Sequence, residues 1–129
     1  PTPISGATFT GQYFTNRTLS GTPALTRADT AINFDWGRNS PASGIPTDNF
    51  SVRWTKTDNF SAGTYRFTAQ TDDGVKLYID GQKVIDYWKD RSAKDSKVDV
   101  TLPAGLHTLV MEYYEKGGRA VAKLSWVRR

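Results

Sequence analysis

The stretch "GTYRFTAQTDDGVKLYIDGQKVID", residues 63–86, decides the fold because its apolar and polar residues alternate. A period of two places alternate side chains on one face of a β-strand and excludes the 3.6-residue period of a helix. The dipeptide Asp80-Gly81 favours a two-residue type I′ hairpin turn, which requires positive φ at both positions. The stretch therefore predicts successive antiparallel strands. The alternating apolar residues are Tyr65, Phe67, Ala69, Val75, Leu77 and Ile79.

The same alternation continues beyond this stretch and predicts further half-buried strands, with Trp54 and Trp126 in the core. The segment 16–49 differs because Gly and Pro interrupt it repeatedly, so we interpret it as a long loop that carries function or wraps the domain. Strands separated by short turns are typical of an all-β, antiparallel β-sandwich. The additional strands are expected within residues 49–55, 97–102, 105–114 and 119–127.

Length and composition limit the class of protein. With 129 residues, 37% hydrophobic and 23% charged, the chain suits one soluble domain, and no apolar run reaches the roughly 18 residues of a membrane helix. The net charge of +4 comes from scattered residues, which argues against nucleic acid as a partner. We expect a linker over residues 1–6 and a single domain over 7–129, which forms a monomeric module of a larger chain.

Asp72 and Asp73 stand side by side before Gly74, and the residues alone leave two interpretations open. Asp and Gly are common in tight turns, so the pair could be a turn and nothing more. Alternatively, a cis peptide bond would turn both carboxylates the same way, and a cation would offset their repulsion. Ca²⁺ suits such a site better than Mg²⁺ because it accepts irregular sets of 6 to 8 oxygen ligands.

Other chemistry has weaker support. His107 is the single histidine and cysteine is absent, so the usual zinc sets and thiolate sites are unavailable. A Ser–His–Asp site would need His107 as its base, yet no nucleophile-elbow motif is present. A pair of carboxylates could serve a glycoside hydrolase, but aspartates holding one ion would be ligands rather than acid and nucleophile. We expect no enzyme.

An ordered set of segments resembles a known family, the protective-antigen-fourteen domain, from about Ala7 to Trp126. This resemblance implies a jelly-roll-like β-sandwich with long loops, found in secreted glycosidases, bacterial adhesins, toxins and yeast flocculation proteins. The segments that carry it are "GQYFTN", "SGTPALTR", "INFDWG", "SPASGIPTDNFSVRWT", "AGTYRFTAQTDDGVKLYIDGQKVID" and "HTLVMEYYEKGGRAVAKLSW".

The resemblance also implies a ligand site. Lectins of the family hold Ca²⁺ between two consecutive aspartates joined by a cis peptide, here Asp72 and Asp73, and a second loop completes the site. That loop reads "EKGG", so Glu115 is the expected side-chain ligand, with the carbonyls of Gly117 and Gly118. Yeast lectins carry an asparagine in this loop, which the present sequence lacks. Candidate sugar-binding residues are Arg119, Trp88, Tyr87 and Trp36; for the two tryptophans, packing in the core is the alternative.

The function expected from the sequence is therefore a calcium-dependent carbohydrate-binding, lectin-like module of a larger secreted or cell-surface protein. Such a module would act outside the cell and bind vicinal hydroxyls of a sugar through the Ca²⁺ ion. The alternative is a non-catalytic structural or interaction domain of a secreted glycosidase or toxin that binds no sugar itself.

Overall fold

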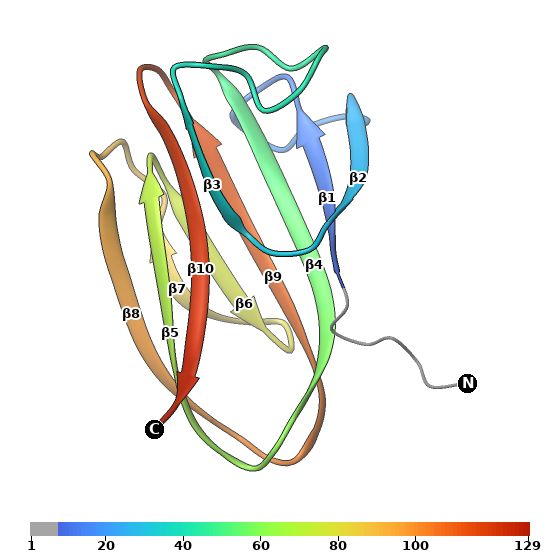
Figure 1. The fold of residues 1–129 in the computed structure, drawn as a ribbon, viewed down its shortest axis with the longest axis vertical. Helices are drawn as coiled ribbons and strands as arrows, with labels where there is room; N and C mark the ends of the chain where they lie inside the picture. Colours follow the sequence, from blue (N-terminus) through green and yellow to red (C-terminus); the bar gives the residue numbers. More distant parts are fainter. Residues whose placement is uncertain (1–7) are drawn as a thin grey trace.

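The computed structural model describes residues 8–129, which form two β-sheets packed face to face (Figure 1). No helix in this described range is long and apolar enough to cross a membrane. The strands are β1 (Phe9–Phe14), β2 (Leu25–Asp29), β3 (Asn33–Gly37), β4 (Phe50–Phe60), β5 (Gly63–Asp72), β6 (Val75–Ile79), β7 (Gln82–Tyr87), β8 (Lys94–Leu102), β9 (Gly105–Glu115) and β10 (Ala120–Arg128).

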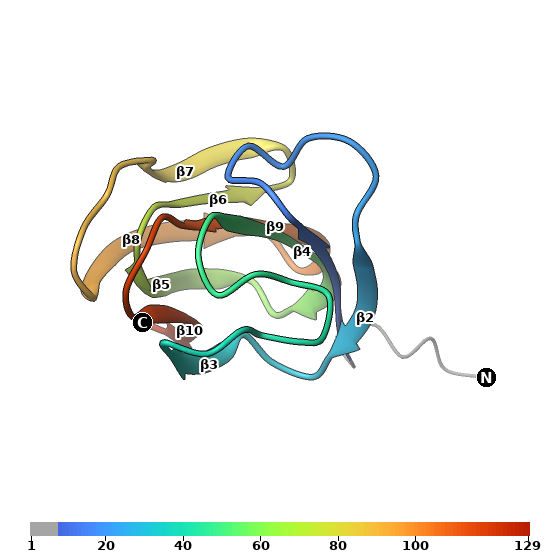
Figure 2. The ribbon, with the colours of Figure 1, turned by 90° about the horizontal axis from the view of Figure 1, so that it is seen from above.

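Six strands form one sheet in the order β2-β1-β4-β9-β6-β7, and four form the other in the order β3-β10-β5-β8. Every neighbouring pair is antiparallel. The view along the strands shows the two layers, with long loops joining them at one end (Figure 2). The structure thus confirms the all-β, antiparallel sandwich with long loops.

The ladder between β4 and β9 forms the middle of the larger sheet and runs from Phe50 opposite Glu115 to Phe60 opposite Gly105. Its fully buried side chains include Trp54 and Tyr113. This register places the last residue of β9 beside the first residue of β4, where the sandwich opens toward its long loops.

The stretch 63–86 forms β5, β6 and β7, as its alternation predicts. Asp80 and Gly81 have φ angles of 52° and 81°, which confirms the two-residue turn with positive φ at both positions. The pairing of Ile79 with Gln82 closes this hairpin.

The prediction that residues 16–49 form one long loop was wrong, because the segment contains β2 and β3. Each has only five residues, lies at the edge of its sheet and is partly exposed. Short edge strands bury few side chains, so their alternation is weak in the sequence. The expected linker over residues 1–6 and the expected domain start at Ala7 lie outside the described residues.

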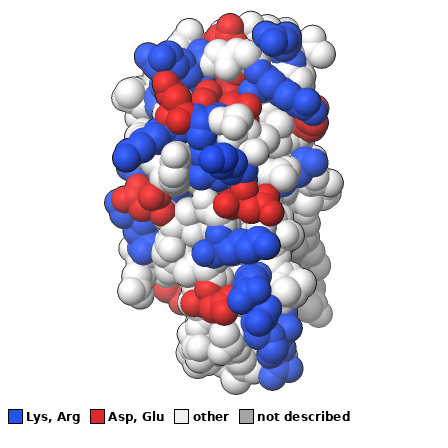
Figure 3. All heavy atoms as spheres, turned by 90° about the vertical axis from the view of Figure 1, so that its left-hand side faces the viewer, with Lys and Arg blue, Asp and Glu red and all other residues white. Residues whose placement is uncertain are grey.

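On the face formed around β8, acidic and basic side chains are interspersed rather than gathered by sign (Figure 3). Arg66 on β5 pairs with Asp99 on β8, where Nε lies 2.8 Å from Oδ1. Such exposed pairs contribute little to stability, but they keep this sheet face polar.

A buried polar cluster fixes β1 and β2 to β4. The carboxylate of Asp29 is 6% exposed and accepts hydrogen bonds from Tyr13 Oη at 2.7 Å and Trp54 Nε1 at 2.9 Å. Arg27 Nε donates to the other carboxylate oxygen at 2.8 Å. The side chain of Asp29 therefore satisfies two donors that the core would otherwise leave without partners.

Replacing Asp29 with Ala is expected to lower the free energy of unfolding by about 2–4 kcal/mol, since each unsatisfied buried donor costs about 1–3 kcal/mol. Urea denaturation measures the loss. Asp99→Ala is the matched control, because it removes an exposed pair and should leave stability nearly unchanged. Equal losses in the two variants would contradict this role of Asp29.

His107 joins the β6–β7 turn to the start of β9. Its Nδ1 lies 2.5 Å from Asp80 Oδ2, and its Nε2 lies 2.7 Å from the carbonyl oxygen of Pro103. Both neighbours are acceptors, so the ring satisfies both contacts only when both nitrogens carry hydrogen. The Asp80 carboxylate raises the pKa of His107 above its ordinary value, and the Pro103 carbonyl has a smaller effect in the same direction.

Stability should therefore fall as the pH rises from 6 to 9. A raised folded-state pKa adds stability that is complete below the unfolded pKa of about 6.5 and is lost as the pH passes the folded value. Urea denaturation of wild type and His107→Gln across this range isolates the effect as the difference between the two curves. The difference should shrink with rising pH, and a constant difference would count against the ion pair.

Candidate metal centre

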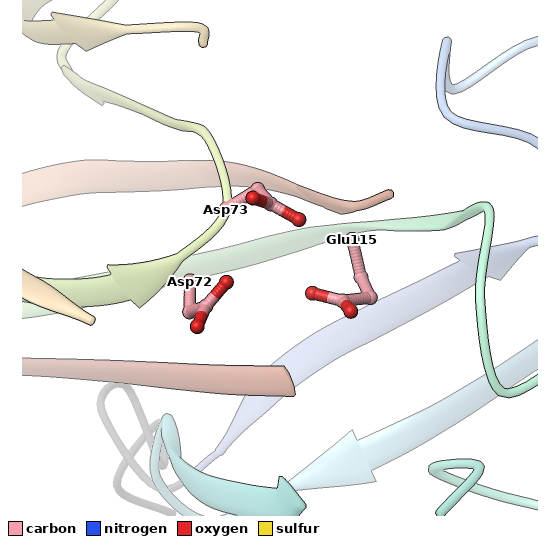
Figure 4. A group of neighbouring side chains, drawn as sticks. All are labelled: Asp72, Asp73 and Glu115. Carbon is pink, nitrogen blue, oxygen red and sulfur yellow. The ribbon is translucent and has the colours of Figure 1, made fainter. Parts of the chain in front are cut away.

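Three carboxylates meet at the end of the sandwich that carries the long loops. Asp72 is the last residue of β5, Asp73 follows in the turn to β6, and Glu115 is the last residue of β9. One oxygen from each lies within 4.8 Å of the others. The three side chains face a common space (Figure 4). Because β5 and β9 belong to different sheets, the cluster spans both layers.

The turn that carries the aspartates is held against β9 by its backbone. The peptide bond between Asp72 and Asp73 is cis. Asp73 N donates to the carbonyl oxygen of Tyr114 at 3.2 Å, and Tyr114 N donates to that of Gly74 at 3.2 Å. The hydroxyl of Tyr113 donates to the carbonyl oxygen of Asp72 at 2.7 Å. These bonds set the position of the turn relative to Glu115.

The carboxylate of Asp73 is oriented by two loops. Its Oδ1 accepts a hydrogen bond from the backbone N–H of Arg91 at 3.0 Å, and its Oδ2 accepts one from that of Lys116 at 2.8 Å. Each oxygen keeps lone pairs for a further contact, because a carboxylate offers about four acceptor positions. Asp73 is thus fixed by backbone donors without being saturated.

Glu115 is in the opposite situation. Its side chain is fully buried, and neither carboxylate oxygen has a hydrogen-bond partner. Burial raises the pKa of Glu115 to about 9, and the negative charges of Asp73 and Asp72 act in the same direction. Burial and the charge of Asp73 also raise the pKa of Asp72 to about 6. Three ionised groups would therefore repel one another in a poorly solvated space.

This donor set fits a hard divalent cation. It consists of oxygens alone, and a cation between them would give Glu115 the partner that it lacks while offsetting the repulsion. Asp72, Asp73 and Glu115 would hold the ion. Their role as ligands stays a prediction, as does the expected contribution from the carbonyls of Gly117 and Gly118 in the adjoining loop.

One acidic residue near the site was missed by the sequence analysis. Asp48, in the loop before β4, lies 3.9 Å from the position that a Cβ at Gly117 would occupy, and its charge also raises the pKa of Glu115. The register of β4 against β9 brings this loop to the end of Glu115's strand. Only this long-range pairing could have revealed Asp48, because the sequence predicts strands β4 and β9 but does not show that they are neighbours.

The candidate sugar-binding residues lie in different places. Arg119 follows the second loop, is 62% exposed and pairs with Asp35, with Nη2 2.6 Å from Oδ2. Tyr87 is 39% exposed, and the Arg91 guanidinium lies 4.4 Å from its ring centroid.

The two tryptophans differ. Trp36 packs against the core, stacked on Phe34 with centroids 4.7 Å apart and edge-on to Phe50 at 5.8 Å. This environment matches the alternative given for Trp36 in the sequence analysis, namely packing against the core. Trp88 contacts Tyr114 at 4.8 Å between centroids, and together they line a surface hollow.

The chain is similar to a known domain family and to proteins of that family. The family model described as the PA14 domain, the family of the resemblance noted in the sequence, matches residues 5–129. Anti-sigma-I factor RsgI3 of Acetivibrio thermocellus is 40% identical over 124 residues, which cover 95% of this chain and 19% of that protein. The chain thus spans about a fifth of that relative's length.

Two solved structures are informative. An anti-sigma factor domain-containing protein has a TM-score of 0.88 and 39% identity, covering 94% of this chain and 43% of that chain. A PA14 sugar-binding domain from an RTX adhesin has a TM-score of 0.67 and 20% identity, covering 95% and 90%. At that identity, the likeness to the adhesin shows the fold alone.

These relatives correct the expected function. The proteins that share about 40% of residues with this chain are named as anti-sigma factors and not as enzymes. The expected role as a secreted lectin was therefore wrong, as was the alternative of a structural or interaction domain in a secreted glycosidase or toxin. The error arose because the same fold occurs in proteins with different roles.

Proposed function

The chain belongs to the PA14 domain family, and on that premise we propose that it is the ligand-sensing domain of an anti-sigma factor. The chain spans about a fifth of the length of RsgI3, and we assign the binding of a sigma factor to another part of such a protein. The task of this domain is to bind a signal molecule outside the cell.

The buried carboxylate of Glu115 carries the proposal for how the signal is bound. A glutamate with no hydrogen-bond donor, beside two aspartates, is poorly stabilised unless a cation joins it. We assign Ca²⁺ to this position, because its flexible coordination tolerates ligands drawn from a turn and a strand end. Mg²⁺ would require a nearly ideal octahedron.

A bound Ca²⁺ ion would also recognise the signal. Three carboxylates leave part of a set of 6 to 8 oxygens open, and neighbouring hydroxyls of a saccharide are neutral oxygen donors that suit those positions. The adhesin relative is named as sugar-binding, which supports the same class of ligand. An extracellular carbohydrate is therefore the proposed signal.

Calcium should raise the melting temperature of the domain, because an ion that binds only the folded state stabilises it by about 2.7 kcal/mol at a hundredfold excess over its Kd. Asp73→Asn should abolish the shift, since it removes a ligand charge from the cluster. Differential scanning calorimetry with Ca²⁺, Mg²⁺ or EGTA measures the effect, and Mg²⁺ should give a smaller one.

Asp58→Asn is the matched control. It makes the same change of charge near the Phe60 end of β4, whereas Phe50 at the other end pairs with Glu115, so the control should keep the full calcium shift. Identical melting temperatures of wild type in Ca²⁺ and EGTA would refute the calcium assignment. An equal loss of the shift in both variants would place the ion elsewhere.

Carbohydrate binding should depend on the ion. An array of cell-wall oligosaccharides probed in Ca²⁺ should give signals that disappear in EGTA and with Asp73→Asn, because the sugar hydroxyls coordinate the ion directly. Asp58→Asn should bind as wild type does. Signals of equal strength in Ca²⁺ and EGTA would mean that the sugar is recognised without the ion.

A further inference from the structure

The segment 88–93 joins β7 to β8 and crosses from the six-stranded layer to the four-stranded one (Figure 2). It has no regular secondary structure. It meets the candidate metal centre through the backbone N–H of Arg91, which donates to Asp73 Oδ1 at 3.0 Å. The position of this N–H therefore decides whether the Asp73 carboxylate has a donor on that side.

The side chain of Arg91 anchors the segment to the four-stranded sheet. Its Nε donates to the carbonyl oxygen of Thr71 at 3.3 Å, and its Nη1 donates to Ser96 Oγ at 3.1 Å. A third donor, Nη2, bonds to the carbonyl oxygen of Lys94 at 2.5 Å. Because Thr71 lies on β5 and the other two acceptors lie on β8, one side chain ties the segment to both strands.

Burial and chemistry agree with an anchoring role for Arg91. The residue is half-buried, whereas its neighbours 89–90 and 92–95 are exposed. Its guanidinium also lies against the ring of Tyr87, a cation–π contact. Arginine suits this place because its planar group presents five N–H donors in a fixed fork, which a lysine ammonium does not.

The preceding residue anchors the segment to the other sheet. Asp90 accepts a hydrogen bond from the Tyr114 hydroxyl at 2.6 Å, and Lys116 Nζ lies 3.1 Å from its Oδ2. Tyr114 belongs to β9 of the six-stranded sheet. The peptide group between Asp90 and Arg91, whose N–H meets Asp73, is thus held by a side chain on each side, and each of these side chains is bound to a different layer.

We propose that Arg91 is a positioning residue of the candidate metal centre, which acts on the ion through Asp73 without touching it. This inference rests on the calcium site of the proposed function. Metal-binding carboxylates are themselves fixed by hydrogen bonds, and loss of such a partner weakens metal affinity by about 10- to 100-fold. Here the donor is a backbone N–H, so the side chain of Arg91 supplies the placement of the donor and not the hydrogen bond itself.

The charge of Arg91 separates this role from simple electrostatics. Its guanidinium also interacts with the charge of Asp72, a second carboxylate of the centre. Removing a positive charge beside a cation site would by itself strengthen binding of the ion, because like charges repel. A positioning role predicts the opposite sign, so Arg91→Ala should weaken the binding of Ca²⁺.

Isothermal titration calorimetry with Ca²⁺ tests this sign. The affinity should fall about tenfold or more in Arg91→Ala. Arg91→Lys keeps the charge but not the fork of donors, so it should also lose affinity, though less. Arg66→Ala is the matched control, because Arg66 likewise joins β5 to β8, with Nε 2.8 Å from Asp99 Oδ1, and it should bind Ca²⁺ as wild type does.

Hydrogen exchange measured by NMR in EGTA tests the placement of the donor without any ion. The amide at position 91 should be protected in wild type and lose protection in Arg91→Ala. The amide of Lys116, which donates to the other oxygen of Asp73, should keep its protection in both. Unchanged protection at position 91, or wild-type or tighter calcium binding in Arg91→Ala, overturns the positioning role alone. A wild-type domain that binds no Ca²⁺ overturns the calcium assignment and this role together.

Discussion

A buried glutamate without a hydrogen-bond donor is the constraint on which this end of the molecule depends. Glu115 reaches the space between the sheets because the β4–β9 ladder runs its full length to that residue. Asp72 and Asp73 meet it there because their turn is bonded to Tyr113 and Tyr114 on the same strand. The strands therefore bring three carboxyl groups together, and backbone donors stabilise Asp73 but not Glu115.

Much of the fold follows from local pattern. Strands that bury one whole face, such as β5 and β6, show the period of two clearly, and the Asp80-Gly81 turn has a chemical signature of its own. The short edge strands β2 and β3 show this period over only five residues each, which is too short to be distinguished from a loop in the sequence, and β3 pairs with β10, which is distant in the chain. Which strands pair with each other depends on the assembled sheet and cannot be deduced from the sequence of any one strand.

Some residues of the candidate site could likewise be predicted from the sequence, and others could not. The adjacent aspartates are visible in the sequence, and the family resemblance adds Glu115, so the three residues that the structure brings together were all predicted from the sequence. Asp48 was missed because only the register between β4 and β9 brings its loop to the site. Trp36 is half-buried and packs against Phe34 and Phe50, which agrees with the core packing that the sequence offered as the alternative to sugar binding.

The fold alone did not indicate the biological role, because it occurs in an adhesin and in anti-sigma factors alike. The position of the site across the two layers would suit it to the proposed sensing role: Asp72 belongs to the four-stranded sheet and Glu115 to the six-stranded one. A cation shared by both sheets, with a sugar completing its coordination, would favour arrangements of the layers that bring these strand ends together. A ligand shifts a conformational equilibrium only by its difference in affinity between states. A site built from both sheets would have that difference, because its ligands would separate if the layers moved apart at this end.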